Sequence, residues 1–236
     1  MAVSVVQTTS LASGTSVAIV AKPSSATDGD LLVLALNWDD TAAISAGPTG
    51  GWTLLTTGQA SASTGGKLRT NIYWKQASTE PANYTANFTF APNWSYQFVV
   101  LRGQNGSTTA IDSPVTIGTG SNAASMVAPA LNISHSSSLR LVFVAEVGFA
   151  GGPLNFTTPA GYTDGGAQIT STVVACTSFT KQITNQGNDG PVTISSSANG
   201  GISPYTALSF AIAASGIAAT PPITFIGGLC LMGVGR

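Results

Sequence analysis

Four aspartates flank a short apolar run in the first part of the chain. In the stretch TDGDLLVLALNWDD, residues 27–40, Asp28 and Asp30 precede six consecutive apolar residues, and Asp39 and Asp40 follow them. Carboxylates gathered in this way could act as a general acid and base, or bind a cation. They could equally be turn residues around one buried β-strand, because short polar side chains hydrogen-bond the local backbone.

Most of the acidic residues favour the turn interpretation. The chain has nine of them, and nearly all lie at predicted turns: Asp28, Asp30, Asp39, Asp40, Glu80, Asp112, Glu146, Asp164 and Asp189. Glu146 is the exception, at the end of a predicted strand. Asp39 and Glu146 are therefore the candidate pair for a glycoside hydrolase. Turn residues remain the favoured interpretation, and we predict no catalytic residue.

Other residue types that could hold a metal or act as a nucleophile are sparse. A calcium site at Asp28 and Asp30, or at Asn188 and Asp189, would need further oxygen ligands, and neither segment is a recognisable calcium loop. His135 is the only histidine, so a Ser-His-Asp triad or a zinc site would depend on it. It lies in NISHSSS, which has no nucleophile-elbow motif and favours a surface loop. We predict no metal and no cofactor.

The sequence context of the two cysteines favours reduced, buried thiols over a disulfide. Cys176 and Cys230 allow a single disulfide, but the N-terminal segment has neither the basic start nor the apolar run of a secretory signal. Reduced thiols are therefore the expected state.

Aromatic residues offer a different chemistry, stacking on sugar rings. Tyr73 and Trp74 are adjacent, so on a strand they must point to opposite faces, and one of them is expected to face outward. Trp94 lies in the predicted loop APNWSY. These three residues form the candidate glycan-binding site. Trp52, after a Gly-Gly turn, is expected in the core.

The composition restricts the kinds of partner. Charged residues make up 7% of the chain, against about 25% in typical soluble domains. The net charge is −1, and eight Lys and Arg are scattered without forming a basic patch, which argues against nucleic-acid binding. A weakly charged surface does not repel its own copies. We therefore expect a protein that is packed among protein neighbours.

The C-terminal segment is uncharged up to its last residue. A transmembrane helix is not expected there, because Pro221 and Pro222 would break a helix and the apolar run after them is too short to span a bilayer. We expect instead an apolar arm, residues 217–236, that docks on another protein surface. Its candidate contact residues are Pro221, Pro222, Phe225, Ile226, Leu229 and Leu231.

Short β-rich runs separated by Gly, Pro, Asn and Ser predict the elements that position these residues. No window has a sustained helical period. The strands expected in the first half are Val3–Gln7, Val17–Ala21, Leu31–Asn37, Trp52–Thr57, Arg69–Gln76, Tyr84–Phe90 and Tyr96–Arg102. The pattern predicts an all-β fold, an antiparallel β-sandwich of jelly-roll or immunoglobulin-like type.

The chain also repeats itself at an offset of 106–110 residues. The matched positions include Leu31 with Leu139, Trp52 with Tyr162, Lys75 with Lys181, Thr85 with Thr193, and Phe98 with Leu208. This predicts two pseudo-repeats of about seven strands, residues 1–105 and 112–216, as one wide sandwich or two in tandem. In the second copy Ser136 and Ser138 replace Asp28 and Asp30, an exchange that suits turn chemistry better than catalysis.

The first copy also carries an ordered set of short motifs. They are Gly29-Asp30-Leu31-Leu32-Val33, Gly51-Trp52-Thr53-Leu54, Tyr73-Trp74-Lys75, Glu80-Pro81, Leu101-Arg102-Gly103 and Asp112-Ser113-Pro114. Over residues 15–115 this order resembles β-sandwich modules of tailed-bacteriophage virion proteins, found in tail-fibre, baseplate and head-decoration genes. The second copy lacks the Arg-Gly ending and the Glu-Pro pair. The resemblance implies no shared catalytic residues.

The expected function is therefore structural and non-enzymatic. We predict a virion protein that forms a symmetric homo-oligomer, with a trimer as the expected state. It would contact other virion proteins on the tail or on the head shell, the latter as a capsid decoration protein. A glycan-binding module for host polysaccharide is the alternative, and a polysaccharide depolymerase is the third hypothesis.

Overall fold

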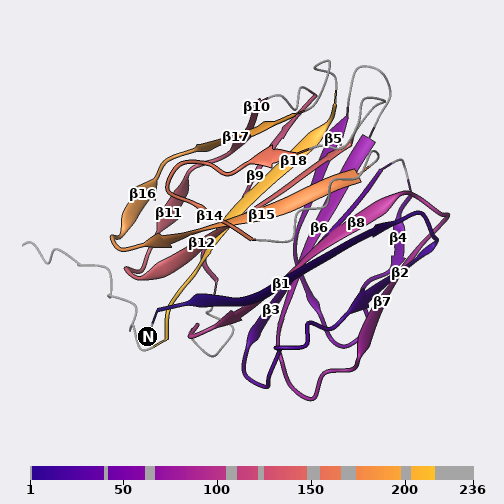
Figure 1. The fold of residues 1–236 in the computed structure, drawn as a ribbon, viewed down its shortest axis with the longest axis horizontal. Coiled ribbons are helices and arrows are strands. Elements are labelled where there is room, and N and C mark those ends of the chain that lie inside the picture. The colour runs from indigo at the N-terminus through magenta and orange to yellow at the C-terminus, as the bar shows by residue number, and fades with distance from the viewer. Residues whose placement is uncertain are drawn as a thin grey trace, which may run out of the picture.

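The computed structural model describes residues 2–39, 42–61, 67–104, 111–121, 125–147, 155–165, 174–197 and 203–215. Every regular element in these ranges is a β-strand, and the strands pair antiparallel (Figure 1). The predicted all-β class with antiparallel sheets is confirmed.

The first half of the chain forms two sheets. Its strands are β1 (Ser4–Ser13), β2 (Val17–Ala21), β3 (Leu31–Asp39), β4 (Ile44–Ala46), β5 (Thr53–Ser61), β6 (Lys67–Gln76), β7 (Asn83–Phe88) and β8 (Trp94–Arg102). The large sheet has the order β1-β8-β3-β6-β5, and the small sheet has the order β2-β7-β4. All seven predicted strands are present, whereas the three-residue β4 has no alternating pattern that could have predicted it.

The second half forms its own sheets. Its strands are β9 (Ile111–Gly120), β10 (Ser125–Ala128), β11 (Leu131–Ile133), β12 (Ser138–Val147), β13 (Phe156–Thr157), β14 (Thr163–Asp164), β15 (Val174–Ile183), β16 (Gly187–Asp189), β17 (Val192–Ser196) and β18 (Tyr205–Ile212). The large sheet has the order β14-β15-β12-β18-β9. A small sheet β10-β17-β13 and a pair β11-β16 complete this half.

The strand order is the same in both halves when one large sheet is read in reverse. β9, β18, β12, β15 and β14 then take the places of β1, β8, β3, β6 and β5, and β10-β17-β13 takes the place of β2-β7-β4. An internal duplication would produce this common order.

In the alignment of the two halves, the predicted match of Phe98 with Leu208 is shifted by one residue relative to the strand pairing. Leu31 pairs with Leu101, and Leu139 pairs with Ile212, so the last strands correspond at an offset of 111 rather than 110. Such a slip matters, because it moves every side chain to the other face of the sheet.

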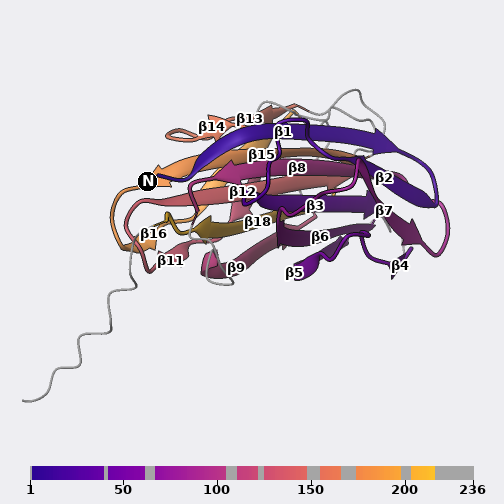
Figure 2. The same ribbon diagram turned by 90° about the horizontal axis from the view of Figure 1, so that it is seen from below.

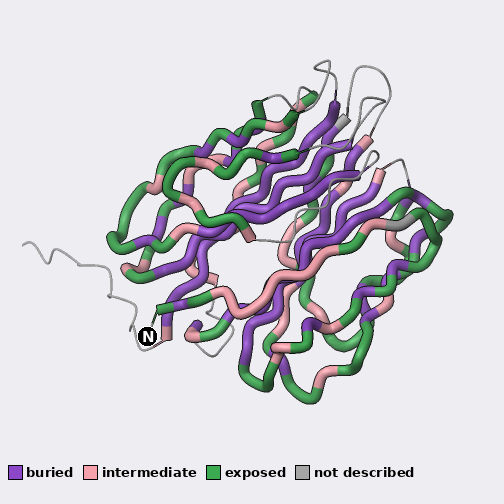
Figure 3. Tube along the Cα trace, in the orientation of Figure 1, coloured by how far each residue is buried: buried purple, intermediate pink, exposed green. Residues whose placement is uncertain are grey.

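The sheets stack as four layers. One core lies between the small and large sheets of the first half, and includes Leu32, Leu34 and Phe98. A second core lies between the two large sheets, where Val33 and Val99 meet Phe143 and Phe210. The third lies within the second half. The buried residues follow the central strands of both halves, where the two large sheets meet (Figures 2 and 3).

Each large sheet is therefore covered on both faces. Eight residues of β3 in a row are buried, from Leu31 to Trp38, and all ten residues of β12 are buried. In an antiparallel sheet with one solvent-exposed face, apolar and polar residues would alternate along each strand. The six apolar residues after Asp30 are the consequence of this double burial.

Each half also places a lysine over an aromatic ring. Lys75 Nζ lies 5.9 Å from the ring centroid of Trp52, and Lys181 Nζ lies 5.7 Å from that of Tyr162. The sequence comparison matched these lysines and these rings with one another. The indole of Trp52 is half-buried and packs against the first core, with its ring centroid 5.1 Å from that of Tyr84.

Replacing Trp52 with Ala tests how much this ring contributes to the core. We expect the free energy of unfolding to fall by about 3 kcal/mol, because a large ring and its edge-to-face contacts are removed. The measurement is urea denaturation followed by circular dichroism. Trp52→Phe, which keeps a ring, should lose less than half as much, and a loss below about 1 kcal/mol in Trp52→Ala would contradict the packing.

Candidate functional site

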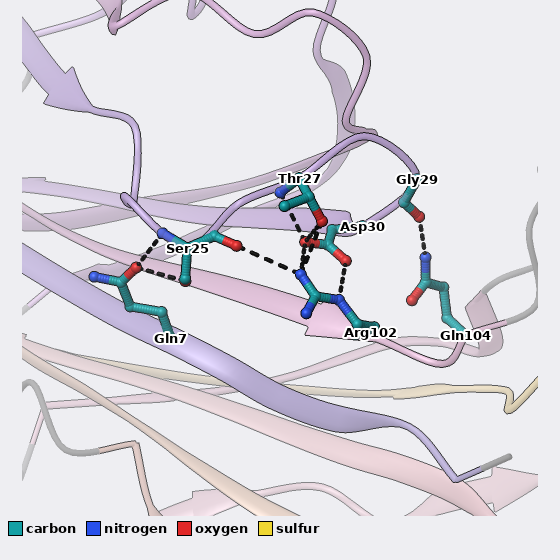
Figure 4. Close-up of polar contacts among 7 residues, drawn as sticks. All are labelled: Gln7, Ser25, Thr27, Gly29, Asp30, Arg102 and Gln104. Carbon is teal, nitrogen blue, oxygen red and sulfur yellow. Dashed lines mark hydrogen bonds and ion pairs between the residues drawn. The ribbon is translucent and has the colours of Figure 1, made fainter.

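The turn before β3 holds the most connected polar cluster of the first half (Figure 4). Arg102, at the end of β8, binds Asp30 with two hydrogen bonds, from Nε to Oδ1 at 2.7 Å and from Nη2 to Oδ2 at 2.7 Å. Thr27 donates to the same carboxylate from its backbone N–H at 2.9 Å. The described contacts of the Asp30 carboxylate therefore join the turn to the end of β8.

The surrounding residues fix the turn itself. Gly29 has a φ of 90°, a conformation that favours glycine. Gln104 donates to the carbonyl of Gly29 at 2.7 Å, and Gln7 accepts from Ser25 at 2.6 Å. Burial alone would raise the pKa of Asp30, but the hydrogen bonds from Arg102 and Thr27 outweigh it and hold the pKa below its usual value.

The neighbouring acids of the opening stretch also bind the backbone. Asp28 Oδ1 accepts from the N–H of Thr79 at 2.8 Å. Asp39 accepts from the N–H of Asn93 at 2.8 Å and from its side-chain amide at 2.9 Å. Asp40 lies outside the described residues. For the three described aspartates, the turn interpretation accounts for the carboxylates.

Two further acids each bind a lysine. Glu80 accepts from Lys75 at 2.9 Å and from the hydroxyl of Tyr84 at 2.7 Å. Asp189 accepts from Lys181 at 2.6 Å and from Arg140 at 2.7 Å. Burial opposes ionisation of both carboxyl groups, but these donors outweigh it and lower both pKa values.

Arg140 is a structural residue that the sequence analysis missed. Its side chain is fully buried in the second half, yet Nε donates to Ser209 at 2.8 Å, and Nη2 donates to the carbonyl of Pro129 at 2.8 Å. Nη1 donates to Asp189 and to the carbonyl of Gly190. A lone arginine inside the apolar run LRLVFV was the available signal, because a buried guanidinium must find several acceptors.

His135 lies beside Asp112, not beside a nucleophile. Its Nδ1 is 2.5 Å from Asp112 Oδ1, and its backbone N–H donates to Oδ2 at 3.2 Å. The hydroxyl oxygen of Ser138 lies 2.7 Å from Asp112 Oδ2 and 2.9 Å from the carbonyl oxygen of His135, so its single proton is shared between these two acceptors. Since the hydroxyl bonds to the acid and not to the imidazole, this cluster lacks the geometry of a triad. It fixes the turn before β12.

Glu146 is fully buried and does not form a pair with Asp39. It lies on the face of β12 that covers the third core, beside Val144, whereas Asp39 ends β3 in the other large sheet. Burial raises the pKa of Glu146 to about 7, although hydrogen bonds from Ser196 and Ser203 lower it in part. The two candidate carboxylates of a hydrolytic pair therefore lie in different sheets.

The candidate glycan-binding aromatics Tyr73, Trp74 and Trp94 pack against the cores of the fold. Tyr73 is 5% exposed and belongs to the first core, and Trp74 packs against the core between the large sheets. Adjacent residues do point to opposite faces, but both faces of this sheet are covered. Trp94 is 2% exposed, stacks on Tyr96 and donates to the carbonyl of Thr15 at 3.1 Å, whereas Trp74 is partly exposed, so the three rings do not form one open platform for a sugar ring.

The core between the large sheets contains a small polar group. Thr70 and Thr206 join the two sheets through their hydroxyls at 2.7 Å, and Thr70 donates to Asn37 at 2.9 Å. Burial raises the pKa of the nearby Cys176 thiol to about 12, and hydrogen bonds from Ser95 and Asn37 lower it only in part. Cys176 is a buried free thiol, as predicted.

The structure does not describe Cys230 or the C-terminal arm, and it can be searched for a metal site or a membrane helix only over the described residues. Cys230 and the six arm residues from Pro221 to Leu231 lie beyond residue 215. Across the described ranges, no cluster of three or more His, Cys, Asp or Glu side chains could hold a metal ion. Within the same part of the chain, no helix has the length and apolar character needed to cross a bilayer.

Comparisons of this chain with protein-family models, with curated proteins and with solved structures found no match.

Replacing Glu146 with Gln tests its buried, protonated state. Because folding raises this pKa from 4.5 to about 7, the wild-type fold should lose stability as pH rises between these values. The amide stays neutral, so the variant should be more stable than the wild type at pH 8.5 by on the order of 3 kcal/mol, with little difference at pH 4.5. Parallel stability curves from urea denaturation across this range would contradict the assignment.

Proposed function

We propose that this chain is a non-enzymatic structural protein of a tailed-bacteriophage particle. In this proposal two related β-sandwich units form one subunit, which assembles as a symmetric oligomer on the tail or on the head shell. The support comes from the resemblance of residues 15–115, from the low charge and from the surfaces of the fold.

The observation that carries the proposal is the uncharged outer face of each small sheet. The exposed residues of β2 are Val17, Ile19 and Ala21, and those of β7 are Asn83 and Asn87. On the opposite side of the four layers, β10 exposes Ser125 and Val127, and β17 exposes Thr193 and Ser195. Faces of this kind can meet other protein surfaces without burying an unpaired charge.

The charged side chains support the same proposal. Asp30, Glu80 and Asp189 each have a cationic partner within the subunit, at 2.6–2.9 Å. Their ionised groups stabilise turns and sheet ends, and they need no partner from outside. A subunit that neutralises its own charges can pack closely against copies and neighbours.

The test is whether the chain is part of the particle. Particles of the virus that encodes it are purified by density gradient and analysed by quantitative mass spectrometry. We expect the chain to copurify at a fixed copy number relative to the major capsid protein. Recovery only from the soluble fraction of the lysate would overturn the proposal.

A deletion of residues 220–236 tests the arm within the same assay. We expect the shortened chain to keep its β circular dichroism spectrum, because the described sheets end before this segment. Its incorporation into particles should fall, because the apolar arm would no longer dock on a neighbour. Unchanged incorporation would contradict the role of the arm, and the full-length chain is the matched control.

A further inference from the structure

Within the described residues, the first large sheet ends in two long edge strands that no further strand covers. β1 and β5 lie at its two ends, with ten and nine residues. Their sequences, SVVQTTSLAS and TLLTTGQAS, contain no charged residue and no proline. Natural sheet edges normally carry such residues, because unpaired backbone groups otherwise recruit strands from other chains.

The other large sheet protects its edges. β9 contains Asp112 and Pro114, and its register with β18 shifts twice. The opposite edge strand, β14, has only two residues. β1 and β5 each have one register shift of their own, so the sheets differ in the charge and proline of β9 and in the shortness of β14 rather than in register.

Each open edge also carries a half-exposed leucine. Leu11 on β1 is 47% exposed, and Leu54 on β5 is 50% exposed. Both project on the face that covers the first core, because their partners Tyr96 and Tyr73 belong to that core. Following the cross-strand pairs from β5 to β1, Leu54 is in the same row of the sheet as Thr9. Thr9 is two residues before Leu11 on β1.

The directions of the two edge strands are compatible with a repeated contact. Each strand from β1 to β5 is antiparallel to its neighbour, so β1 and β5 run in the same direction. They lie at opposite sides of the molecule (Figure 2). A rotation about an axis along the strands would bring β5 of one copy beside β1 of the next as a parallel pair.

We propose that β5 of one copy pairs with β1 of a second copy of this chain, and that this contact continues the first large sheet from subunit to subunit. Each copy offers one edge of each kind, so a closed ring leaves neither edge free. Leu54 of one subunit then packs beside Leu11 of the next. The inference rests on the self-assembly proposed above, and it names the surfaces that make the contact.

The test measures mass in solution with single charges placed on the edges. The wild-type chain should be oligomeric by analytical ultracentrifugation. Leu54→Lys and Leu11→Glu should each raise the dissociation constant by about 10- to 100-fold. Phe90→Lys is the matched control, because Phe90 is 42% exposed between β7 and β8, outside both edge strands and outside the outer faces described above. It should leave the mass unchanged, and all variants should keep the wild-type circular dichroism spectrum.

Mixing the two edge variants identifies the partner of each edge. An equimolar mixture of Leu54→Lys and Leu11→Glu should recover association at low salt, because a lysine on β5 then meets a glutamate on β1. Loss of association in Leu11→Glu but not in Leu54→Lys would overturn the inference in favour of a β1–β1 contact. Dissociation by Phe90→Lys alone would place the interface outside the two edges and overturn it as well.

This experiment separates the inference from the proposed function. A wild-type chain that stays monomeric in solution up to millimolar concentration would overturn the edge contact. Only its absence from purified particles would overturn the structural role.

Discussion

The large sheets of this protein must be apolar on both faces, because each lies between two cores. This constraint decides the sequence of the central strands, which are buried along nearly their whole length. It also decides where charge can be placed. At turns and sheet ends, the carboxylates of Asp30 and Asp189 bind cationic side chains. Arg140 is buried in the interior, where each nitrogen of its guanidinium donates to an acceptor.

The fold was largely predictable because hydrophobic runs and turn residues are local signals. The predicted strands match β3 and β6 to within two residues, and the repeat of Lys75 over Trp52 as Lys181 over Tyr162 follows from the sequence comparison. The face assignments were less predictable. Whether a strand is covered on one side or on two depends on how sheets stack, and no local pattern reports this. For that reason the sequence did not show that Tyr73 and Trp74 each face a core.

The roles of the candidate acidic residues depend on contacts with residues that are distant in the sequence. Turn composition predicted the role of Asp28, Asp30 and Asp39 correctly, since the exchange of Asp for Ser between the copies suits a turn. The pairing of Asp30 with Arg102, 72 residues away, and that of Asp112 with His135 had no such signal. Together these contacts describe a chain whose polar side chains stabilise its own turns and sheet ends.

The coupling of the two halves through the core between the large sheets is the central physical claim. All four tryptophans belong to the first half, so their fluorescence reports on that half, whereas circular dichroism reports on both. Phe143 lies in the second half and packs into the shared core. In urea, Phe143→Ala should lower the midpoint of the fluorescence transition together with that of the dichroism transition. A fluorescence transition that stays at the wild-type midpoint, while the dichroism splits into two steps, would contradict the account.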